Sequence, residues 1–141
     1  MEIWSHNTQI FNVMMGLKIK YGGKIPPHLL AAMSEIQHDL PVKPQSFGRR
    51  RSLQTHFEKH AELGFANAAE YEKAALRFAG RTSPSSMVLE SRANRNWVKF
   101  DPATKEYAVL NQRGELVTYF KKDRFTGEQA FERFLSENTH P

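Results

Sequence analysis

The chain has 141 residues, no cysteine, a formal net charge of +5 and a pI of about 9.6. This composition suits a single globular domain and excludes both a disulfide framework and a thiolate metal site. The charge is uneven, because residues 1–60 carry a net +4 and residues 61–141 only +1. A basic surface favours anionic partners such as nucleic acid, acidic lipid or an acidic protein.

The sequence predicts no membrane span. No apolar run approaches the roughly 20 residues that a spanning helix needs. The basic residues among the first 25 follow the apolar part, which is the reverse of the order in a signal peptide.

The first third of the chain predicts helices followed by a linker. Residues 10–24 could form either a strand or a short helix, and Pro26-Pro27 precede a predicted helix over 28–40. The stretch PVKPQSFG at 41–48 is typical of a linker. We therefore predict a domain boundary there, with residues 1–48 as an N-terminal helical arm, linker or remnant of a delivery region, and 49–141 as the functional domain.

Capping signals predict two helices after this boundary. Ser52 can cap a helix that runs to about Leu63, and Gly64 is suited to end it. The sequence from Asn67 to Glu70 has the form of a capping box and predicts a second helix to Phe78.

The rest of the chain predicts an antiparallel meander. Apolar residues recur with period two in residues 96–101, 106–111 and 115–121, and residues 87–91 form a possible fourth strand. A capping box beginning at Thr126 predicts a C-terminal helix. The order indicates an α+β fold, with N-terminal helices packed on one face of the sheet and the other face free to bind.

The helix predicted over 53–63 gathers His56, Lys59 and His60 on one face, because positions i, i+3 and i+4 are neighbours. A solvated polar face is the simplest interpretation. A metal site is a second one, but Phe57 stands where a zincin motif has glutamate, and no third ligand is evident. A third is metal-free phosphodiester cleavage, which needs an imidazole as proton acceptor and a cation near the phosphorus oxygens.

The strand predicted over 115–121 could supply a second part of such a site. Period two places Leu116, Thr118 and Phe120 on one face and Val117, Tyr119 and Lys121 on the other. Threonine in a strand is usually no more than a β-former. A hydroxyl close to an aromatic ring can nevertheless hydrogen-bond a phosphate while the ring supports the site wall.

The two segments together resemble a toxin family. The motifs are KHA-x-LGF at 59–65, F-D-P-x-T followed by G-E-L-V-T in the meander, and T-Y-F-K at 118–121. They resemble the catalytic domain of colicin D and related modules of the barnase–EndoU–colicin–RelE superfamily, many of which are C-terminal toxins of contact-dependent inhibition and other polymorphic toxin systems. The resemblance covers roughly residues 53–122.

The resemblance implies a barnase- or colicin D-like α+β domain with metal-independent endoribonuclease activity on tRNA, often in the anticodon loop, and products with 2′,3′-cyclic phosphate and 5′-OH ends. It implies no cofactor and an acidic immunity protein as partner. The toxin domain would be monomeric, would be secreted or delivered from a producer cell, and would act in the cytoplasm of a target cell.

The resemblance also implies roles for individual residues. Lys59-His60 match the family's lysine and essential histidine, so His60 is expected to be a general base or acid and Lys59 to stabilise the phosphorane. The family's second lysine is replaced by Phe57, so its role is missing or moves to His56, which we expect to act opposite to His60. Thr118 and Phe120 match a serine and a tryptophan. Threonine keeps the hydroxyl that positions phosphate, and Tyr119 or Phe120 would complete the wall.

Basic residues outside this set are candidates for contacts with the RNA backbone. They are Arg49, Arg50, Arg51, Arg92, Arg95 and Lys121. For Arg92, Arg95 and Lys121, ordinary solvated surface charge is the simpler explanation of each residue taken singly, and for Arg49 to Arg51 the two explanations are balanced. Two alternatives to a nuclease stay open: a non-catalytic RNA- or DNA-binding module of similar α+β shape, and a structural fragment of a larger phage or secreted protein.

Overall fold

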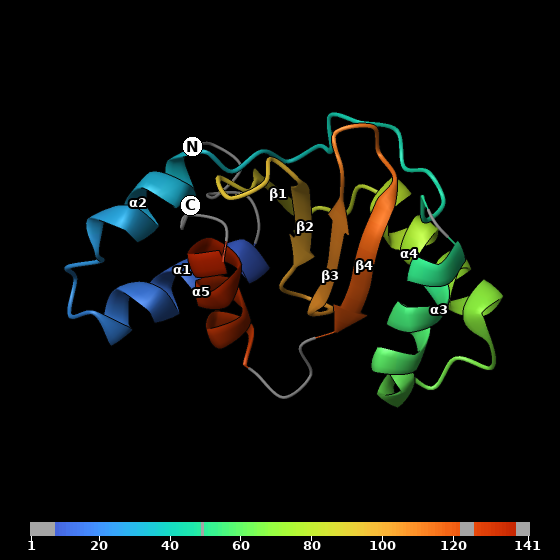
Figure 1. The fold of residues 1–141 in the computed structure, drawn as a ribbon. Coiled ribbons are helices and arrows are strands. Elements are labelled where there is room, and N and C mark those ends of the chain that lie inside the picture. Colours follow the sequence, from blue (N-terminus) through green and yellow to red (C-terminus); the bar gives the residue numbers. More distant parts are fainter. Residues whose placement is uncertain (1–7, 49, 122–125, 138–141) are drawn as a thin grey trace.

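A four-stranded antiparallel sheet separates two groups of helices in the computed structural model, which describes residues 8–48, 50–121 and 126–137 (Figure 1). The strands are β1 (Met87–Glu90), β2 (Trp97–Asp101), β3 (Glu106–Leu110) and β4 (Leu116–Lys121), and they pair in the order β1-β2-β3-β4. The predicted α+β class and the four-stranded meander are confirmed.

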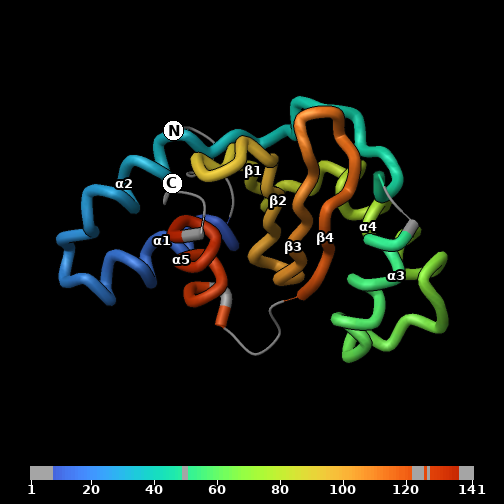
Figure 2. Tube along the Cα trace, viewed as in Figure 1, coloured from blue at the N-terminus to red at the C-terminus, as the bar shows by residue number. Residues whose placement is uncertain are grey.

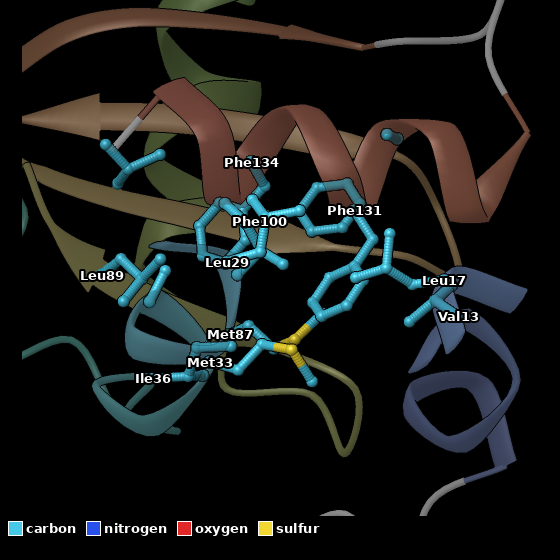
Figure 3. Close-up of a cluster of buried hydrophobic side chains, with 14 of the residues drawn as sticks. Val13, Leu17, Leu29, Met33, Ile36, Met87, Leu89, Phe100, Phe131 and Phe134 are labelled. Atoms are coloured by element: carbon cyan, nitrogen blue, oxygen red, sulfur yellow. The ribbon is translucent and has the colours of Figure 1, made fainter. Parts of the chain in front are cut away.

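Three helices cover one face of the sheet. They are α1 (Thr8–Lys20), α2 (Pro27–Ser34) and α5 (Gly127–Glu137). Figure 3 shows their apolar side chains meeting those of β1 and β2; the core includes Leu17, Leu29, Met33, Met87, Phe100, Phe131 and Phe134. The capping box before α5 is formed as predicted, since the Gln129 N–H donates to Thr126 Oγ1 at 3.1 Å and the Thr126 N–H to Gln129 Oε1 at 2.9 Å.

Residues 8–36 of the segment assigned from the sequence to an arm (1–48) contribute to this core. The first segment is a helix rather than a strand, and its Ile10, Val13 and Leu17 are buried. The segment after α2 crosses one end of the sheet, pairing Gln37 with Val88 and Gln45 with Glu115 (Figure 2). The predicted boundary at residue 48 therefore does not coincide with a break in the hydrophobic core.

The second face of the sheet is covered by α3 (Arg50–Lys59), a 3₁₀ turn η2 (Ala61–Leu63) and α4 (Ala68–Gly80). Their core residues include Leu53, Tyr71, Phe78, Leu110, Leu116 and Tyr119. The expectation that one sheet face is free to bind is therefore wrong. Polar residues on this face are buried with partners: Lys99 Nζ donates to the Ala79 carbonyl oxygen at 3.2 Å and to that of Arg81, and Asp101 accepts from the Ser83 and Ser85 hydroxyls.

The helices of this layer differ from their predicted bounds at the point that matters for the site. Helix α3 begins at Arg50 rather than after Ser52, and it ends at Lys59. His60 leaves the helical conformation, with φ −109° and ψ 35°, and η2 follows. Gly64 ends the segment in the left-handed conformation at φ 79°, as its position predicted.

Among the described residues, no helix is long and apolar enough to cross a membrane.

Candidate active site at the edge of β4

The outer edge of β4 is closed by a tyrosine of α4. The Tyr71 hydroxyl donates to the Tyr119 carbonyl oxygen at 2.5 Å and accepts from the Tyr119 N–H at 3.1 Å. An edge strand otherwise leaves such main-chain groups without partners. Tyr71 is fully buried, so these two bonds fix α4, and α3 packed beside it, against the edge of the sheet (Figure 1).

A β-bulge in β4 determines which side chains face the site. Val109 pairs with Thr118 but Leu110 pairs with Leu116, so Val117 is the extra residue. A bulge re-aims the side chains around it. Leu116 accordingly packs in the second core, while Thr118 and Phe120 lie on the opposite face. The prediction that Leu116 shares their face is wrong, because period-two alternation does not continue through the bulge.

His60 meets the two residues of β4 that the resemblance had selected. Its Nε2 lies 3.4 Å from Thr118 Oγ1. Its ring stacks on Phe120 with centroids 5.3 Å apart and an interplanar angle of 19°. Phe120 in turn stacks on the buried ring of Tyr107 at 5.0 Å. The fold thus brings an imidazole, a hydroxyl and an aromatic wall together from two distant segments.

The other nitrogen of His60 has a carboxylate beside it. Nδ1 lies 3.6 Å from Glu62 Oε1, and the Glu62 side chain is 67% exposed. The sequence did not indicate this residue as part of the site, because a continuous helix would turn positions i and i+2 to different sides. The change from α3 to the 3₁₀ turn at His60 removes that restriction.

His56 and Lys59 extend the site along α3. The His56 ring stacks on His60 at 6.2 Å with an interplanar angle of 10°, and on Phe47 at 6.0 Å. Its Nδ1 is buried without a hydrogen-bond partner among the described residues. Lys59 is exposed, and its charge acts on both rings. The predicted grouping of these three side chains therefore has a counterpart in the structure, with the imidazoles inside and the ammonium at the rim.

The surroundings of both imidazoles favour the neutral form. Burial lowers the pKa of His56 below its usual value, and the charges of His60 and Lys59 lower it further. Burial also lowers the pKa of His60; Glu62 acts in the opposite direction, and Lys59 adds to the lowering. The Glu62 contact at 3.6 Å does not reverse the effect of burial, because that carboxylate is largely solvated. Neutral imidazoles at pH 7 can accept protons.

Tyr119 does not take the position predicted for it in the site wall. Its side chain lies in the second core with 2% exposure, and its hydroxyl donates to Glu106 Oε2 at 2.6 Å. Burial and the Glu106 carboxylate raise the pKa of this phenol, so it is neutral and structural. Of the two candidates, Phe120 forms the wall beside His60 and Tyr119 does not.

The basic candidates are dispersed. Arg92 and Arg95 lie in the turn between β1 and β2, where they pair with Glu35 and Glu90 respectively; β2 and β3 separate β1 from β4, so these arginines are not brought to His60. Arg51 lies exposed in the first turn of α3, and Lys121 lies exposed one residue after Phe120. Arg49 and the side chain of Arg50 lie outside the described residues.

Two aromatic residues that were not predicted from the sequence also contact the histidines of the site. Phe47 stacks on His56, and Tyr71 lies 6.5 Å from the ring of His60. Both looked like ordinary apolar positions in the sequence. Within the described ranges, no three His, Cys, Asp or Glu side chains are grouped so that they could hold a metal ion.

Comparison of the chain with known protein families and with curated proteins finds no match. The arrangement itself offers a proton acceptor, a hydroxyl donor and a cation on one surface. These groups suit a reaction at a phosphodiester, in which a hydroxyl proton is removed while negative charge builds on phosphorus oxygens.

Proposed function

We propose that the protein is a metal-independent endoribonuclease toxin that cleaves tRNA, within the anticodon loop, to leave 2′,3′-cyclic phosphate and 5′-OH ends. The observation that carries the proposal is the position of His60 Nε2, 3.4 Å from Thr118 Oγ1 and over the ring of Phe120. These are the residues that the resemblance to colicin D-like toxins pairs, although they lie 58 positions apart in the chain.

The proposed reaction uses the groups as follows. His60 Nε2 accepts the proton of a ribose 2′-OH, and the 2′-oxygen attacks phosphorus. The bond from phosphorus to the 5′-oxygen breaks, and that oxygen takes a proton from protonated His56. The Lys59 ammonium stabilises the charge on the non-bridging oxygens, and the Thr118 hydroxyl donates to one of them. Phe120 supports the His60 ring and forms the wall of the site.

A second chemistry has one observation in its favour. Glu62, His60 and Thr118 lie in a row that is similar to an acid–histidine–hydroxyl triad, in which Thr118 would be a nucleophile for acyl transfer. In hydrolases of that kind the amide after the nucleophile commonly stabilises the oxyanion. The Tyr119 N–H, which follows Thr118, is bonded to the Tyr71 hydroxyl instead. We therefore favour phosphodiester cleavage, for which Lys59 is also suited.

The proposal includes a partner and a place of action. A toxin ribonuclease must be neutralised in its producer, so an acidic immunity protein would cover the face formed by His56, Lys59 and His60 and would mimic phosphate with Asp and Glu. Electrostatic attraction would make association fast and sensitive to salt. The toxin would be delivered to a target cell and would act in its cytoplasm.

Incubation of purified full-length protein with total tRNA in EDTA tests the proposal. We expect fragments whose 5′-OH ends fall at a few positions, identified by sequencing. The matched control is the His60→Ala protein from the same purification, which reports contaminating nuclease. Binding of tRNA without cleavage would favour the non-catalytic module, and absence of both would favour a structural fragment. Activity lost in EDTA and restored by magnesium or zinc would contradict the mechanism.

A further inference from the structure

We infer that Glu62 is a positioning residue for His60: its carboxylate, in ion-pair contact with Nδ1, holds the ring proton on that nitrogen and so leaves Nε2 free to take a proton beside Thr118. The catalytic meaning of this inference rests on the proposed function, but the arrangement itself does not. Glu62 lies in η2. The proposed catalytic residues lie elsewhere: in α3, at His60 directly after α3, and in β4.

The two neighbours of the His60 ring define one consistent placement of its proton. A neutral imidazole carries a proton on one nitrogen only, and an ionised carboxylate can only accept. Glu62 Oε1 lies 3.6 Å from Nδ1 and Thr118 Oγ1 lies 3.4 Å from Nε2. The proton therefore belongs on Nδ1. The Nε2 lone pair then points to the side of the site where Thr118 lies, from which a ribose hydroxyl would approach it during cleavage.

The local backbone is shaped so that this contact can form. If α3 continued, residues 60 and 62 would diverge around the helix. Instead His60 leaves the helical region, and the tighter turn from Ala61 to Leu63 returns Glu62 toward the ring. Gly64 ends this turn at φ 79°, a conformation that favours glycine. The early end of α3 thus has a consequence for the chemistry of His60.

The other titratable groups around His60 cannot substitute for Glu62. Those on α3 are His56 and Lys59, which are neutral or cationic, and the one on α4 is Tyr71, whose hydroxyl is engaged with the main chain of β4. Thr118 and Phe120 of β4 do not titrate at neutral pH. Among the described groups that act on His60, Glu62 is thus the one negative charge, and it raises the pKa that burial lowers.

The test is the Glu62→Gln variant of the full chain, studied by NMR of the histidine ring nitrogens and by cleavage kinetics. We expect His60 in the wild type to carry its proton on Nδ1. The variant should lose that preference and titrate at lower pH. Its cleavage of tRNA at pH 7 should fall on the order of 5-fold, the scale of an exposed ion pair, while the acid limb of the rate profile moves to lower pH.

Glu58→Gln is the matched control, because Glu58 lies in α3, is exposed and is hydrogen-bonded by Gln54. It should leave the His60 spectrum and the rate unchanged. An unchanged His60 proton position and titration in Glu62→Gln would overturn the inference. If the wild type does not cleave RNA, the proposed function fails, and the NMR measurement still decides whether Glu62 orients His60.

Discussion

His60 Nε2 lies 3.4 Å from the hydroxyl oxygen of Thr118, and three features of the fold produce this contact. Helix α3 ends at Lys59, so His60 turns toward the sheet. The bulge at Val117 turns Leu116 into the second core, while Thr118 stays on the face of Phe120. The hydroxyl of Tyr71 forms two hydrogen bonds with the main chain of Tyr119 and so holds α4 against the edge of β4. The contact is thus a product of tertiary structure in both segments.

Removing the Thr118 hydroxyl should slow cleavage. Thr118→Ala should cost about 1.5–3 kcal/mol of transition-state stabilisation, the value of a hydrogen bond to a charged group, or roughly 10-fold to 160-fold in rate. Thr118→Ser keeps the hydroxyl and should retain most of the activity. Single-turnover cleavage of tRNA measures both. Thr55→Ala is the control, since Thr55 is exposed on α3 and its hydroxyl donates to the Arg51 carbonyl oxygen. Equal rates for Thr118→Ala and wild type would remove Thr118 from the mechanism.

Replacing Lys59 should affect the transition state more than binding. The ammonium matters most when the phosphorane forms, so Lys59→Ala should reduce the single-turnover rate by a larger factor than it weakens tRNA affinity. Both quantities can be measured with the same labelled tRNA. Lys73→Ala, at an exposed lysine of α4, is the control for loss of one positive charge. A loss of affinity that accounts for the whole loss of rate would assign Lys59 to binding alone.

The pH profile tests the opposite roles of the two histidines. The base His60 must be neutral to act, so the rate should rise as the pH increases through the pKa of His60. The acid His56 must be protonated, so the rate should fall as the pH increases through the pKa of His56. Burial lowers both pKa values below the ordinary 6.5. The maximum should therefore lie below about pH 6.5. A rate that rises to a plateau between pH 7 and 8 would show that His56 is not the acid.

The elements of this fold were easier to predict than their contacts. Period two located the strands, the predicted N-cap bond from the Glu70 N–H to Asn67 is formed, and so is the capping box at Thr126. The covered second face was missed because Lys99 and Asp101 look like solvent-facing residues, whereas both are buried with partners.

Within the site, the sequence pattern predicted a strand with unbroken alternation at β4 and a helix that continues through His60. The bulge at Val117 and the turn at His60 depend on packing between distant segments, which no local pattern encodes. Glu62 could be recognised only once that turn was known.

Helix α1 should contribute to the stability of the whole domain. Leu17 is fully buried against α5 and the sheet, while Ile19 on the same helix is 75% exposed. Leu17→Ala should lower the free energy of unfolding by about 2–5 kcal/mol, and Ile19→Ala should change it by no more than about 0.5 kcal/mol. Urea denaturation followed by circular dichroism measures both. Similar small effects would mean that residues 1–48 are an arm separate from the functional domain.

The most direct test of the proposed active site is the single-turnover rate of His60→Ala on tRNA, with circular dichroism as the folding control. Loss of a general acid–base group typically reduces rates by roughly 10²-fold or more, and we expect a loss of that size in a protein that remains folded. His28→Ala, at an exposed histidine of α2, should cleave like the wild type. If His60→Ala folds normally and cleaves at the wild-type rate, the imidazole beside Thr118 takes no part in catalysis and the proposed active site is contradicted.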